Sequence, residues 1–412
     1  MSDRAAERPG DPTGRHGPLA GVRVLDLGTR IAAPFCAGLL GELGADVIKI
    51  EQPGTGDFMR EIGPFVEQEG DRGYSLFWAV EGRGRRSVTL DLRRPEGQDV
   101  FRRLAATADI VCENFRPGTL ERWGIGPDAC DRRIVWVRIS TFGQDGPYAP
   151  RPGLDRVGIG FGGLMHLTGD PDRPPVRVGV TISDYLTGSF AANAALAALF
   201  RRDTRGGEGA VVDACLYGAV LRVLEWTLAA YDRLGVVRSR EGNRLANSAP
   251  LDNYPTADGK YVCIVAGSDA NFGRLCKAMG RPDLASDERY ARLADRAARS
   301  DEINGVVADW TRTLPAAEIV ERCVACDVPV ATAYTAADVF ADPHMDARGD
   351  LVTVDDPVIG AVRQQAPFPR FVGEEVPVPS GAPRLGAHTR DVLRELGLSD
   401  GDIDALADEG VV

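Results

Sequence analysis

Short apolar runs alternate with longer segments of helical periodicity along the first half of the chain. Runs that are typical of buried strands occupy residues 21–28, 46–51, 109–115, 133–140 and 207–216. Segments that are typical of helices occupy residues 33–45, 95–108 and 184–203. Strands that alternate with helices in this way are joined by right-handed crossovers and form a mostly parallel sheet with helices on both faces. The pattern therefore predicts an α/β fold.

A change of pattern near residues 220–245 marks a boundary within the chain. There a predicted long helix is followed by the polar stretch "RSREGNRLANS". Beyond it the pattern predicts a second, smaller α/β unit and a final helix. The elements predicted there are a strand at 260–267, a helix at 271–280, further helices up to Asp327, a strand at 350–356 and a helix at 388–397.

The composition of the 412 residues is that of an ordinary globular enzyme, with 44% hydrophobic and 26% charged residues. The formal net charge of -12 weighs against non-specific nucleic-acid binding, which needs a basic surface. Residues 1–20 lack the apolar core of a signal peptide, and no apolar run is long enough to span a membrane. We therefore expect a cytoplasmic protein with a flexible N-terminal tail, and with neither nucleic acid nor membrane as a partner.

Two of the eight cysteines, Cys323 and Cys326, form a C-x-x-C motif. The motif lies in "PAAEIVERCVACD", which has the periodicity of an amphipathic helix. No second pair and no nearby histidine complete a zinc site. We interpret both cysteines as structural and expect no metal in the protein.

The stretch "DRVGIGFGG" contains the G-x-G-x-x-G spacing of a dinucleotide-binding turn, with Asp184 at about the expected distance downstream. In such a turn the first glycine ends a strand and the last begins a helix, so that backbone N–H groups face the pyrophosphate. Here the glycines are Gly158, Gly160 and Gly163, and the stretch before them, "APRPGLD", is no core strand. The spacing therefore does not indicate a nicotinamide site.

Two acids flank these glycines, and both are candidate catalytic residues. Asp155 follows "RPGL", and Asp184 follows "VGVTIS" at the start of a helix rich in small residues. The pattern places Asp184 as the N-cap of that helix. One interpretation is capping alone; the other is a carboxylate that the helix N-terminus keeps ionised for use as a nucleophile. Sequence spacing leaves both interpretations open.

Several ordered blocks of the chain resemble one enzyme family. They are "LAGVRVLDLGTRIAAPFCAGLLGELGADVIKIEQPGTGD", "RRSVTLDLRRPEG", "VCENFRPGTLERWGIG", "STFGQDGPY", "PGLD", "GLMHLTGDPDRPPVRVGVTISD" and the ending "LGAHTRDVLRELGLSDGDIDALADEGVV". From about Leu19 to Val412 the chain resembles the class III CoA-transferases. That family includes formyl-CoA transferase, carnitine CoA-transferase, succinyl-CoA:glutarate CoA-transferase and alpha-methylacyl-CoA racemase.

The resemblance implies a fold and an assembly. It implies a large Rossmann-like domain built from both ends of the chain, a smaller α/β domain from the middle, and an interlocked homodimer. The expected segments are a flexible tail at 1–18, the first part of the large domain at 19–220, a linker at 221–245, the small domain at 246–330, and a linker and return to the large domain at 331–412.

The resemblance also implies the chemistry. Asp184 matches the family's aspartate nucleophile, which forms an aspartyl-CoA thioester while CoA moves from an acyl-CoA donor to a small carboxylic acid. Coenzyme A is thus implied as the co-substrate, and the glycines as backbone that an acyl-CoA approaches closely. Without the resemblance, the arginines among the matched positions would be interpreted as an exposed charged face. The positions that match CoA contacts are Leu90, Arg93, Asn114, Phe115 and Arg122.

Two departures from the family pattern separate its branches. Racemases of the family carry a histidine directly before the acid that matches Asp155, whereas this chain has Leu154, which cannot titrate. The glycine-rich loop of formyl-CoA transferase has no counterpart between residues 245 and 275. A CoA-transferase is therefore the leading hypothesis. A racemase or isomerase of the same family and a non-catalytic CoA-binding protein remain the alternatives.

Two arginines are candidate substrate contacts. Arg30 follows the first predicted strand, where parallel-sheet proteins place ligand contacts, and Arg60 follows the "GTGD" turn. Either guanidinium could hold a second carboxylate of the acceptor bidentately, which favours short dicarboxylic acids, with succinyl-CoA as a plausible donor. The alternative is that both arginines bind CoA phosphates or acids of the protein itself.

Overall fold

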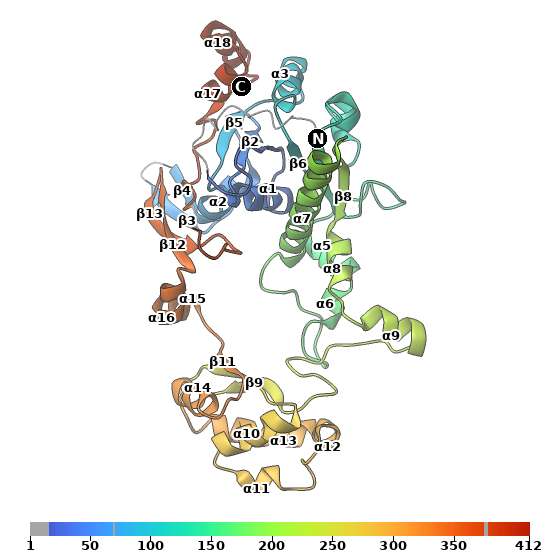
Figure 1. The fold of residues 1–412 in the computed structure, drawn as a ribbon, viewed down its shortest axis with the longest axis vertical. Helices are drawn as coiled ribbons and strands as arrows, with labels where there is room; N and C mark the ends of the chain where they lie inside the picture. The colour runs from blue at the N-terminus through green and yellow to red at the C-terminus, as the bar shows by residue number, and fades with distance from the viewer. Residues whose placement is uncertain (1–15, 69–70, 375–377) are drawn as a thin grey trace. The chain divides into compact units, whose positions relative to one another are not determined.

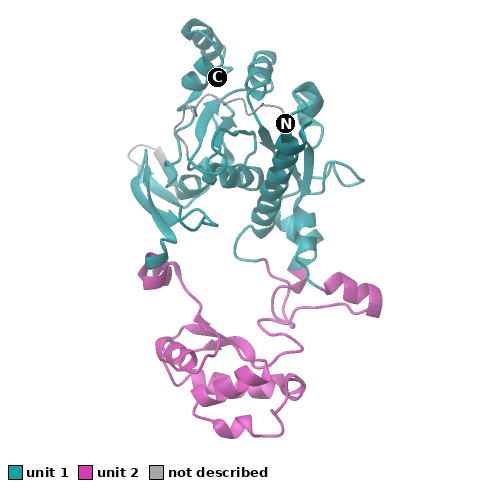
Figure 2. Cartoon of the chain, in the orientation of Figure 1, with its two compact units in different colours: residues 1–164, 178–225, 347–412 teal, residues 165–177, 226–346 magenta. Residues whose placement is uncertain are grey.

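The computed structural model of the protein describes residues 16–68, 71–374 and 378–412. The chain divides into two compact units, which Figure 2 colours separately. Unit 1 comprises residues 1–164, 178–225 and 347–412, and unit 2 comprises residues 165–177 and 226–346. The segment expected as the small domain lies within unit 2. Most of the expected N-terminal tail, residues 1–15, lies outside the described residues.

Six parallel strands form the central sheet of unit 1, in the order β5-β2-β1-β6-β7-β8 (Figure 1). The predicted α/β fold with a mostly parallel sheet is therefore confirmed. The strand order reverses between β1 and β6, and α/β proteins bind ligands at such a point, outside the carboxyl ends of the strands. The strands are β1 Arg23–Asp26, β2 Asp46–Glu51, β5 Arg86–Thr89, β6 Ile110–Glu113, β7 Val135–Ser140 and β8 Val211–Cys215.

Successive strand residues point to opposite faces of the sheet and fill two separate cores. Val24 packs with helices α1 (Ala32–Glu42) and α7 (Ile182–Arg205), and Leu25 packs on the opposite face. That opposite face is covered by α3 and by the two last helices, so the end of the chain returns to unit 1 (Figure 1). These helices are α3 Pro95–Ala105, α17 Thr389–Glu395 and α18 Asp400–Asp408.

A glycine sets how closely α1 and α7 approach each other. A Cβ atom on Gly188 would lie 2.8 Å from the backbone oxygen of Ala32, which no real side chain tolerates. The second turn of α7 therefore lies directly against the first turn of α1. This contact brings Asp184 of α7 to the loop that follows β1.

Unit 1 also contains shorter elements outside the central sheet. Strands β3 and β4 pair with each other, as do β12 and β13, and both pairs are antiparallel. These elements are η1 Phe58–Glu61, β3 Phe65–Gln68, β4 Asp71–Ser75, α2 Leu76–Glu81, α4 Thr119–Arg122, η2 Pro127–Ala129, α5 Asp155–Phe161, α8 Leu216–Arg222, β12 Leu351–Asp356 and β13 Gly360–Gln365. Helices α6 Leu164–Leu167 and α16 Pro343–Arg348 lie where the chain passes between the units.

Unit 2 is a three-stranded antiparallel sheet, in the order β11-β10-β9, with helices packed on it. The C-x-x-C motif ends α14, and Cys323 is fully buried in the core of this unit. Burial raises the pKa of the Cys323 thiol to about 12, which disfavours the reactive thiolate. The elements are α9 Thr227–Leu234, β9 Leu251–Pro255, β10 Tyr261–Val265, α10 Asp269–Ala278, α11 Pro282–Ala285, α12 Leu293–Ala298, α13 Ser300–Thr311, α14 Ala316–Val324, β11 Val330–Thr332 and α15 Ala336–Ala341.

Two details differ from the sequence-based expectation. The long helix expected at 220–245 is instead two short helices, because Glu225 between α8 and α9 adopts a left-handed conformation with φ of 53°. Residues 165–177, expected in the large domain, belong to unit 2. They are held there by hydrogen bonds such as that from Arg240 Nη1 to the backbone oxygen of His166.

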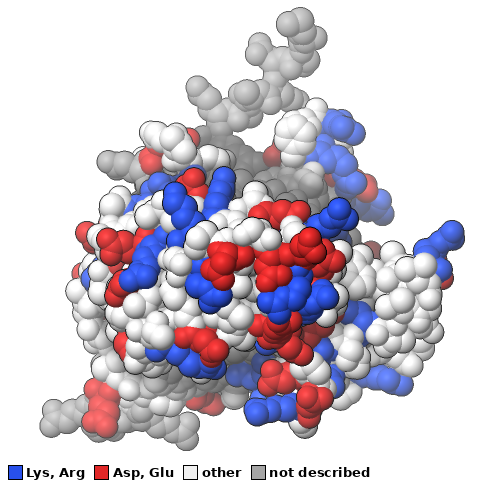
Figure 3. Space-filling model, turned by 90° about the horizontal axis from the view of Figure 1, so that it is seen from below, with Lys and Arg blue, Asp and Glu red and all other residues white. Residues whose placement is uncertain are grey.

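In the part of the chain that the structure describes, no helix is both long and apolar enough to cross a membrane. On the face shown in Figure 3, acidic and basic side chains alternate. Several of the exposed charges in unit 2 are ion pairs, such as Arg281 with Asp283 and Arg289 with Asp287.

Candidate active site

A cavity of about 690 Å³ opens at the carboxyl ends of β1, β6 and β7. We call it the main cavity. It lies entirely within unit 1, at the point where the strand order reverses. Its walls are residues 29–32 after β1, 114–117 after β6, 139–141 at the end of β7, 149 and 151–154, 156–157, Asp184 and Leu216.

Asp184 reaches this cavity from the first turn of α7, but not as the expected N-cap. The helix begins at Ile182, with Thr181 as its N-cap, so Asp184 is the third helical residue. A neighbouring acid takes the capping role. The Oδ1 atom of Asp155 accepts a hydrogen bond from the backbone N–H of Ser183 at 2.9 Å and another from its hydroxyl at 2.8 Å. Because Asp155 satisfies an N–H at the helix start, the Asp184 carboxyl is left to face the cavity.

The environment of Asp184 brings its ionisation close to neutral pH. Burial raises the pKa of its carboxyl to about 7, and the negative charge of Asp155 contributes to the rise, whereas the positive charge of Arg30 opposes it. Asp155 is itself buried and does not line the cavity. The structure thus brings the two candidate acids together, with Asp184 in contact with the cavity and Asp155 behind its wall.

Four arginines line the main cavity: Arg30, Arg116, Arg151 and Arg156. Among the described residues, none of the four forms an ion pair with an acid at salt-bridge distance. Cations that the protein does not itself neutralise suit a ligand with several negative charges. Of these four, the sequence indicates only Arg30 as a substrate contact, although the other three adjoin the motifs "ENF" and "PGLD".

A smaller cavity of about 220 Å³, the side cavity, adjoins the main one, because Thr29 and Phe115 line both. Leu90, Leu92 and Trp123 give it apolar walls, and the rings of Phe115 and Trp123 meet edge to face at 5.3 Å. Two of the matched CoA positions, Leu90 and Arg93, thus line the side cavity, and Phe115 lines both cavities.

The other positions matched to CoA contacts are placed differently. Arg93 is exposed and its guanidinium is held by Asp91, at 2.7 and 2.8 Å. Asn114 lines the main cavity, but both polar atoms of its side-chain amide bind the backbone of Thr29. Arg122 is exposed, donates to the hydroxyl of Thr119, and lines neither cavity.

Arg60, expected as a substrate contact, points into the protein interior instead. Its guanidinium donates to both oxygens of the buried Glu51 at 2.8 Å and to the backbone oxygen of Pro383 at 3.1 Å. It also lies over the ring of Trp78, with its central carbon 3.7 Å from the ring centre. The alternative interpretation, that an arginine binds an acid of the protein itself, therefore holds for Arg60, and Arg30 remains the candidate substrate arginine.

The glycines of "GIGFGG" serve helix packing and do not line the main cavity, contrary to the expectation from the resemblance. A Cβ on Gly158 would lie 2.8 Å from the Cβ of Leu216, and one on Gly162 would lie 2.6 Å from a methyl group of Val220. Helix α5 can therefore pack against α8 only because these positions lack side chains. This packing also places Asp155, the first residue of α5, beside α7.

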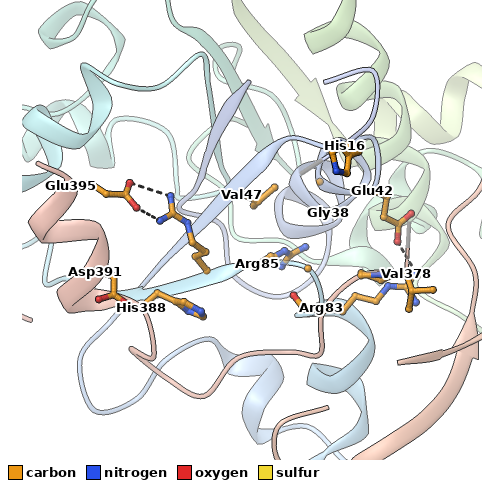
Figure 4. A pocket seen from close by; sticks show the side chains of 16 residues that line it. His16, Gly38, Glu42, Val47, Arg83, Arg85, Val378, His388, Asp391 and Glu395 are labelled. Atoms are coloured by element: carbon orange, nitrogen blue, oxygen red, sulfur yellow. Dashed lines mark hydrogen bonds and ion pairs between the residues drawn. The ribbon is translucent and has the colours of Figure 1, made fainter. Parts of the chain in front are cut away.

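A third cavity, of about 580 Å³, lies on another part of unit 1 (Figure 4). It too contains arginines, but acids of the protein pair with them: Arg83 with Glu42 at 2.5 Å and Arg86 with Glu395 at 2.5 Å. The main cavity differs because it combines unpaired arginines with a carboxyl that titrates near neutral pH. Within the described residues, no group of three or more potential ligands is arranged to hold a metal ion.

Comparison with known proteins identifies the class. The model of CoA-transferase family III matches residues 19–389. A succinyl-CoA–D-citramalate CoA-transferase of Chloroflexus aurantiacus is 42% identical over 96% of this chain and 98% of its own length. A succinate–glutarate CoA-transferase of Agrobacterium fabrum is 35% identical over 94% of this chain and 97% of its own length.

A solved structure agrees with this result. The crystal structure of a CAIB/BAIF family protein from Brucella suis superimposes with a TM-score of 0.82 at 35% identity, covering 93% of this chain and all of that one. The chain belongs to CoA-transferase family III. The prediction that the protein is a CoA-transferase, with an acyl-CoA as co-substrate, is therefore confirmed.

Proposed function

We propose that the protein transfers CoA from a donor such as succinyl-CoA to a short dicarboxylic acid, through a thioester on Asp184. The observation that carries this proposal is the placement of Asp184, with a pKa of about 7, in a cavity lined by four unpaired arginines. The two relatives described above are named for D-citramalate and glutarate, which are both dicarboxylates. One cavity then holds both the proposed nucleophile and the arginines that can bind the negative charge of the acceptor.

The reaction proceeds in two half-reactions. The Asp184 carboxylate attacks the thioester carbonyl of the donor, giving a mixed anhydride and expelling the CoA thiolate. The thiolate then attacks the aspartyl carbonyl, which gives the aspartyl-CoA thioester and releases the donor acid. The acceptor carboxylate reverses these steps and leaves as its CoA thioester. Helix α1 has no side-chain cap and its first residue, Ala32, lines the cavity, so the start of this helix supplies backbone N–H for the oxyanions.

We place CoA across the two connected cavities. The adenine occupies the side cavity against Leu90 and Phe115, and the pantetheine passes Phe115 and Thr29 into the main cavity. The exposed guanidiniums of Arg93 and Arg122, and that of Arg116, are our candidates for the phosphates.

Arg30 is the proposed contact for the second carboxylate of the substrate. It lines the main cavity, and its charge influences the ionisation of Asp184. A racemase is disfavoured by the same lining. Racemisation needs two titratable groups, whereas Asp184 is the one carboxyl among the described lining residues and Leu154 lies where racemases carry histidine.

The proposed assembly is an interlocked homodimer in the cytoplasm. Helix α9 of unit 2 exposes Leu228, Tyr231 and Leu234, with 55, 63 and 75% of their surface accessible in one chain. Apolar side chains gathered on one helix in this way suit coverage by a second copy. Size-exclusion chromatography with light scattering tests this, and a monomer at micromolar concentration would contradict it.

The thioester proposal is tested by trapping. The protein is incubated with succinyl-CoA, treated with hydroxylamine and digested, and mass spectrometry locates the aspartyl hydroxamate. We expect it on Asp184 and nowhere else. Asp184→Ala should lower transfer at least a thousandfold while binding CoA as tightly as the wild type, and the exposed Asp145→Asn serves as the matched control. A hydroxamate on another residue, or full activity of Asp184→Ala, contradicts the mechanism.

A further inference from the structure

The turn that carries Arg30 is held by side chains at nearly every backbone polar group. The N–H of Gly28 donates to Asp26 at 3.0 Å, and the carbonyl of Gly28 accepts from the fully buried ammonium of Lys49. The N–H of Arg30 donates to the Oδ1 atom of Asp57 at 3.0 Å. These bonds tie the turn to the sheet interior from one side.

Asn114 holds the same turn from the other side. Its Oδ1 accepts from the N–H of Thr29 at 2.9 Å, and its Nδ2 donates to the carbonyl of Thr29 at 2.7 Å. The two bonds hold the peptide groups on both sides of Thr29, as a neighbouring strand would. Asn114 follows β6 and Thr29 follows β1, so the bonds join the two loops that diverge where the strand order reverses.

Arg30 needs such restraint because its backbone is in an unfavourable conformation. Its φ is 66°, in the left-handed region, which is unfavourable for a residue with a Cβ. A conformation of this kind persists only where the surroundings impose it, and such residues cluster at functional sites. Here the imposed turn directs the side chain of Arg30 to the wall of the main cavity.

The other end of Arg30 is also placed by this network. Its guanidinium carbon lies 4.0 Å from the centre of the Phe58 ring. The same Oδ1 atom of Asp57 that accepts from Arg30 accepts from the N–H of Met59 at 2.9 Å and so begins the short helix η1 that carries Phe58. One buried carboxylate, paired with Lys49 at 2.9 Å, thus positions both the peptide of Arg30 and the ring beneath its guanidinium.

We propose that Asn114 and Asp57 are positioning residues that aim Arg30, and that Asn114 thereby sets the preference for an acceptor with a second carboxylate instead of binding CoA. This inference rests on the proposed function, in which Arg30 holds that carboxylate. The selectivity of the site for dicarboxylic acids then depends on the side-chain amide of Asn114, which touches no substrate.

The test compares glutarate with pentanoate, an acid of the same length without the second carboxylate. In a two-step transfer, kcat/KM for the acceptor reports only the reaction of the CoA-loaded enzyme, so the donor does not influence it. Asn114→Ala should lower the glutarate-to-pentanoate ratio of kcat/KM about tenfold, leaving the affinity for CoA within twofold of wild type. In an Arg30→Asn background, Asn114→Ala should not change the ratio further. Asparagine tolerates a positive φ, so Arg30→Asn removes the guanidinium without adding strain.

Phe115→Ala is the matched control, because this neighbour lines both cavities and is our proposed CoA contact. It should weaken CoA binding and leave the ratio unchanged, which is the opposite pattern. Phe58→Leu provides a second approach to Arg30 and should lower the ratio about two- to fivefold through the lost cation–π contact.

Two outcomes would overturn the inference. Weaker CoA binding by Asn114→Ala with an unchanged ratio would show that Asn114 contacts CoA. An equal effect of Asn114→Ala with and without Arg30 would show that it does not act through Arg30. Neither outcome affects the thioester proposal, which depends on trapping at Asp184.

Discussion

Replacing Asp184 by asparagine should make the protein more stable at alkaline pH while removing its activity. The pKa of this carboxyl rises from 3.8 to about 7 on folding, mainly through burial. Between pH 3.8 and about pH 7, Asp184 is therefore protonated in the folded protein and ionised in the unfolded chain. A group of this kind favours folding below pH 4, and the contribution is lost as the pH rises through 7.

The size of the effect follows from the pKa. A tenfold change in an ionisation constant corresponds to about 1.4 kcal/mol, so ionised Asp184 destabilises the fold by about 4 kcal/mol at most. About 2.7 kcal/mol of this develops between pH 5 and pH 8. Asp184 is only half-buried and faces an open cavity, where water screens part of the effect, so we expect about 1–3 kcal/mol.

Urea unfolding of wild type and Asp184→Asn at pH 5 and pH 8 measures this quantity. The variant should gain stability over the wild type on going from pH 5 to pH 8. All other titrating groups are common to both proteins and cancel in the difference. Asp145→Asn, at an exposed aspartate, should show no such change. A difference between wild type and Asp184→Asn that is the same at both pH values would refute the assigned pKa and its cause.

Four further outcomes follow from the same contacts. In the proposed mechanism the Asp184 carboxylate is the nucleophile, so kcat/KM for the acyl-CoA should fall about tenfold per pH unit below pH 7. Burial is the main cause of the raised pKa of Asp184, and the charge of Asp155 adds to it, so Asp155→Asn should move this fall to lower pH; an unmoved profile would contradict the coupling. Arg60→Met leaves the buried Glu51 without its partner and should lower the free energy of unfolding by about 3 kcal/mol, with the glutarate-to-pentanoate ratio unchanged; an altered ratio would return Arg60 to the site. Arg156→Gln should raise KM for the acyl-CoA about tenfold with little effect on unfolding by urea; an unchanged KM would remove Arg156 from the binding surface.

Five of the six strands of the central sheet and the long helix α7 were predictable because their apolar residues recur at the spacing that each structure requires. Strand β5 (Arg86–Thr89) escaped because Val88 is the one apolar residue within it, too few to show a periodicity. The division into α8 and α9 escaped because it depends on the backbone of Glu225, and no periodicity reports a left-handed residue. Local patterns thus identify elements, but they do not report single residues whose conformation depends on distant packing.

The candidate site was predictable in part for a similar reason. A resemblance can match Asp184 to a nucleophile, but Arg30 and Arg60 follow similar turns and look alike in the sequence. Only the folded chain shows that the guanidinium of Arg60 binds Glu51 and lies over Trp78, whereas Arg30 faces the cavity. The role of Asp155 was equally hidden, because its hydrogen bond to Ser183 spans 28 residues.

The two acids divide tasks that one aspartate could not combine. An N-cap carboxylate is committed to backbone N–H groups, which hold it ionised but also reduce its reactivity as a nucleophile. Asp155 caps α7 from the neighbouring helix α5, so the Asp184 carboxylate need not bind those N–H groups. The negative charge of Asp155 also adds to the rise that burial causes in the pKa of Asp184. Arg30 limits that rise, so that a substantial fraction of Asp184 is ionised near pH 7. When the second carboxylate of a substrate pairs with Arg30, this limit weakens and the Asp184 carboxylate becomes more basic. At pH 7 a dicarboxylic donor would thus reduce the ionised fraction of Asp184, the proposed nucleophile, while making each remaining carboxylate a stronger base.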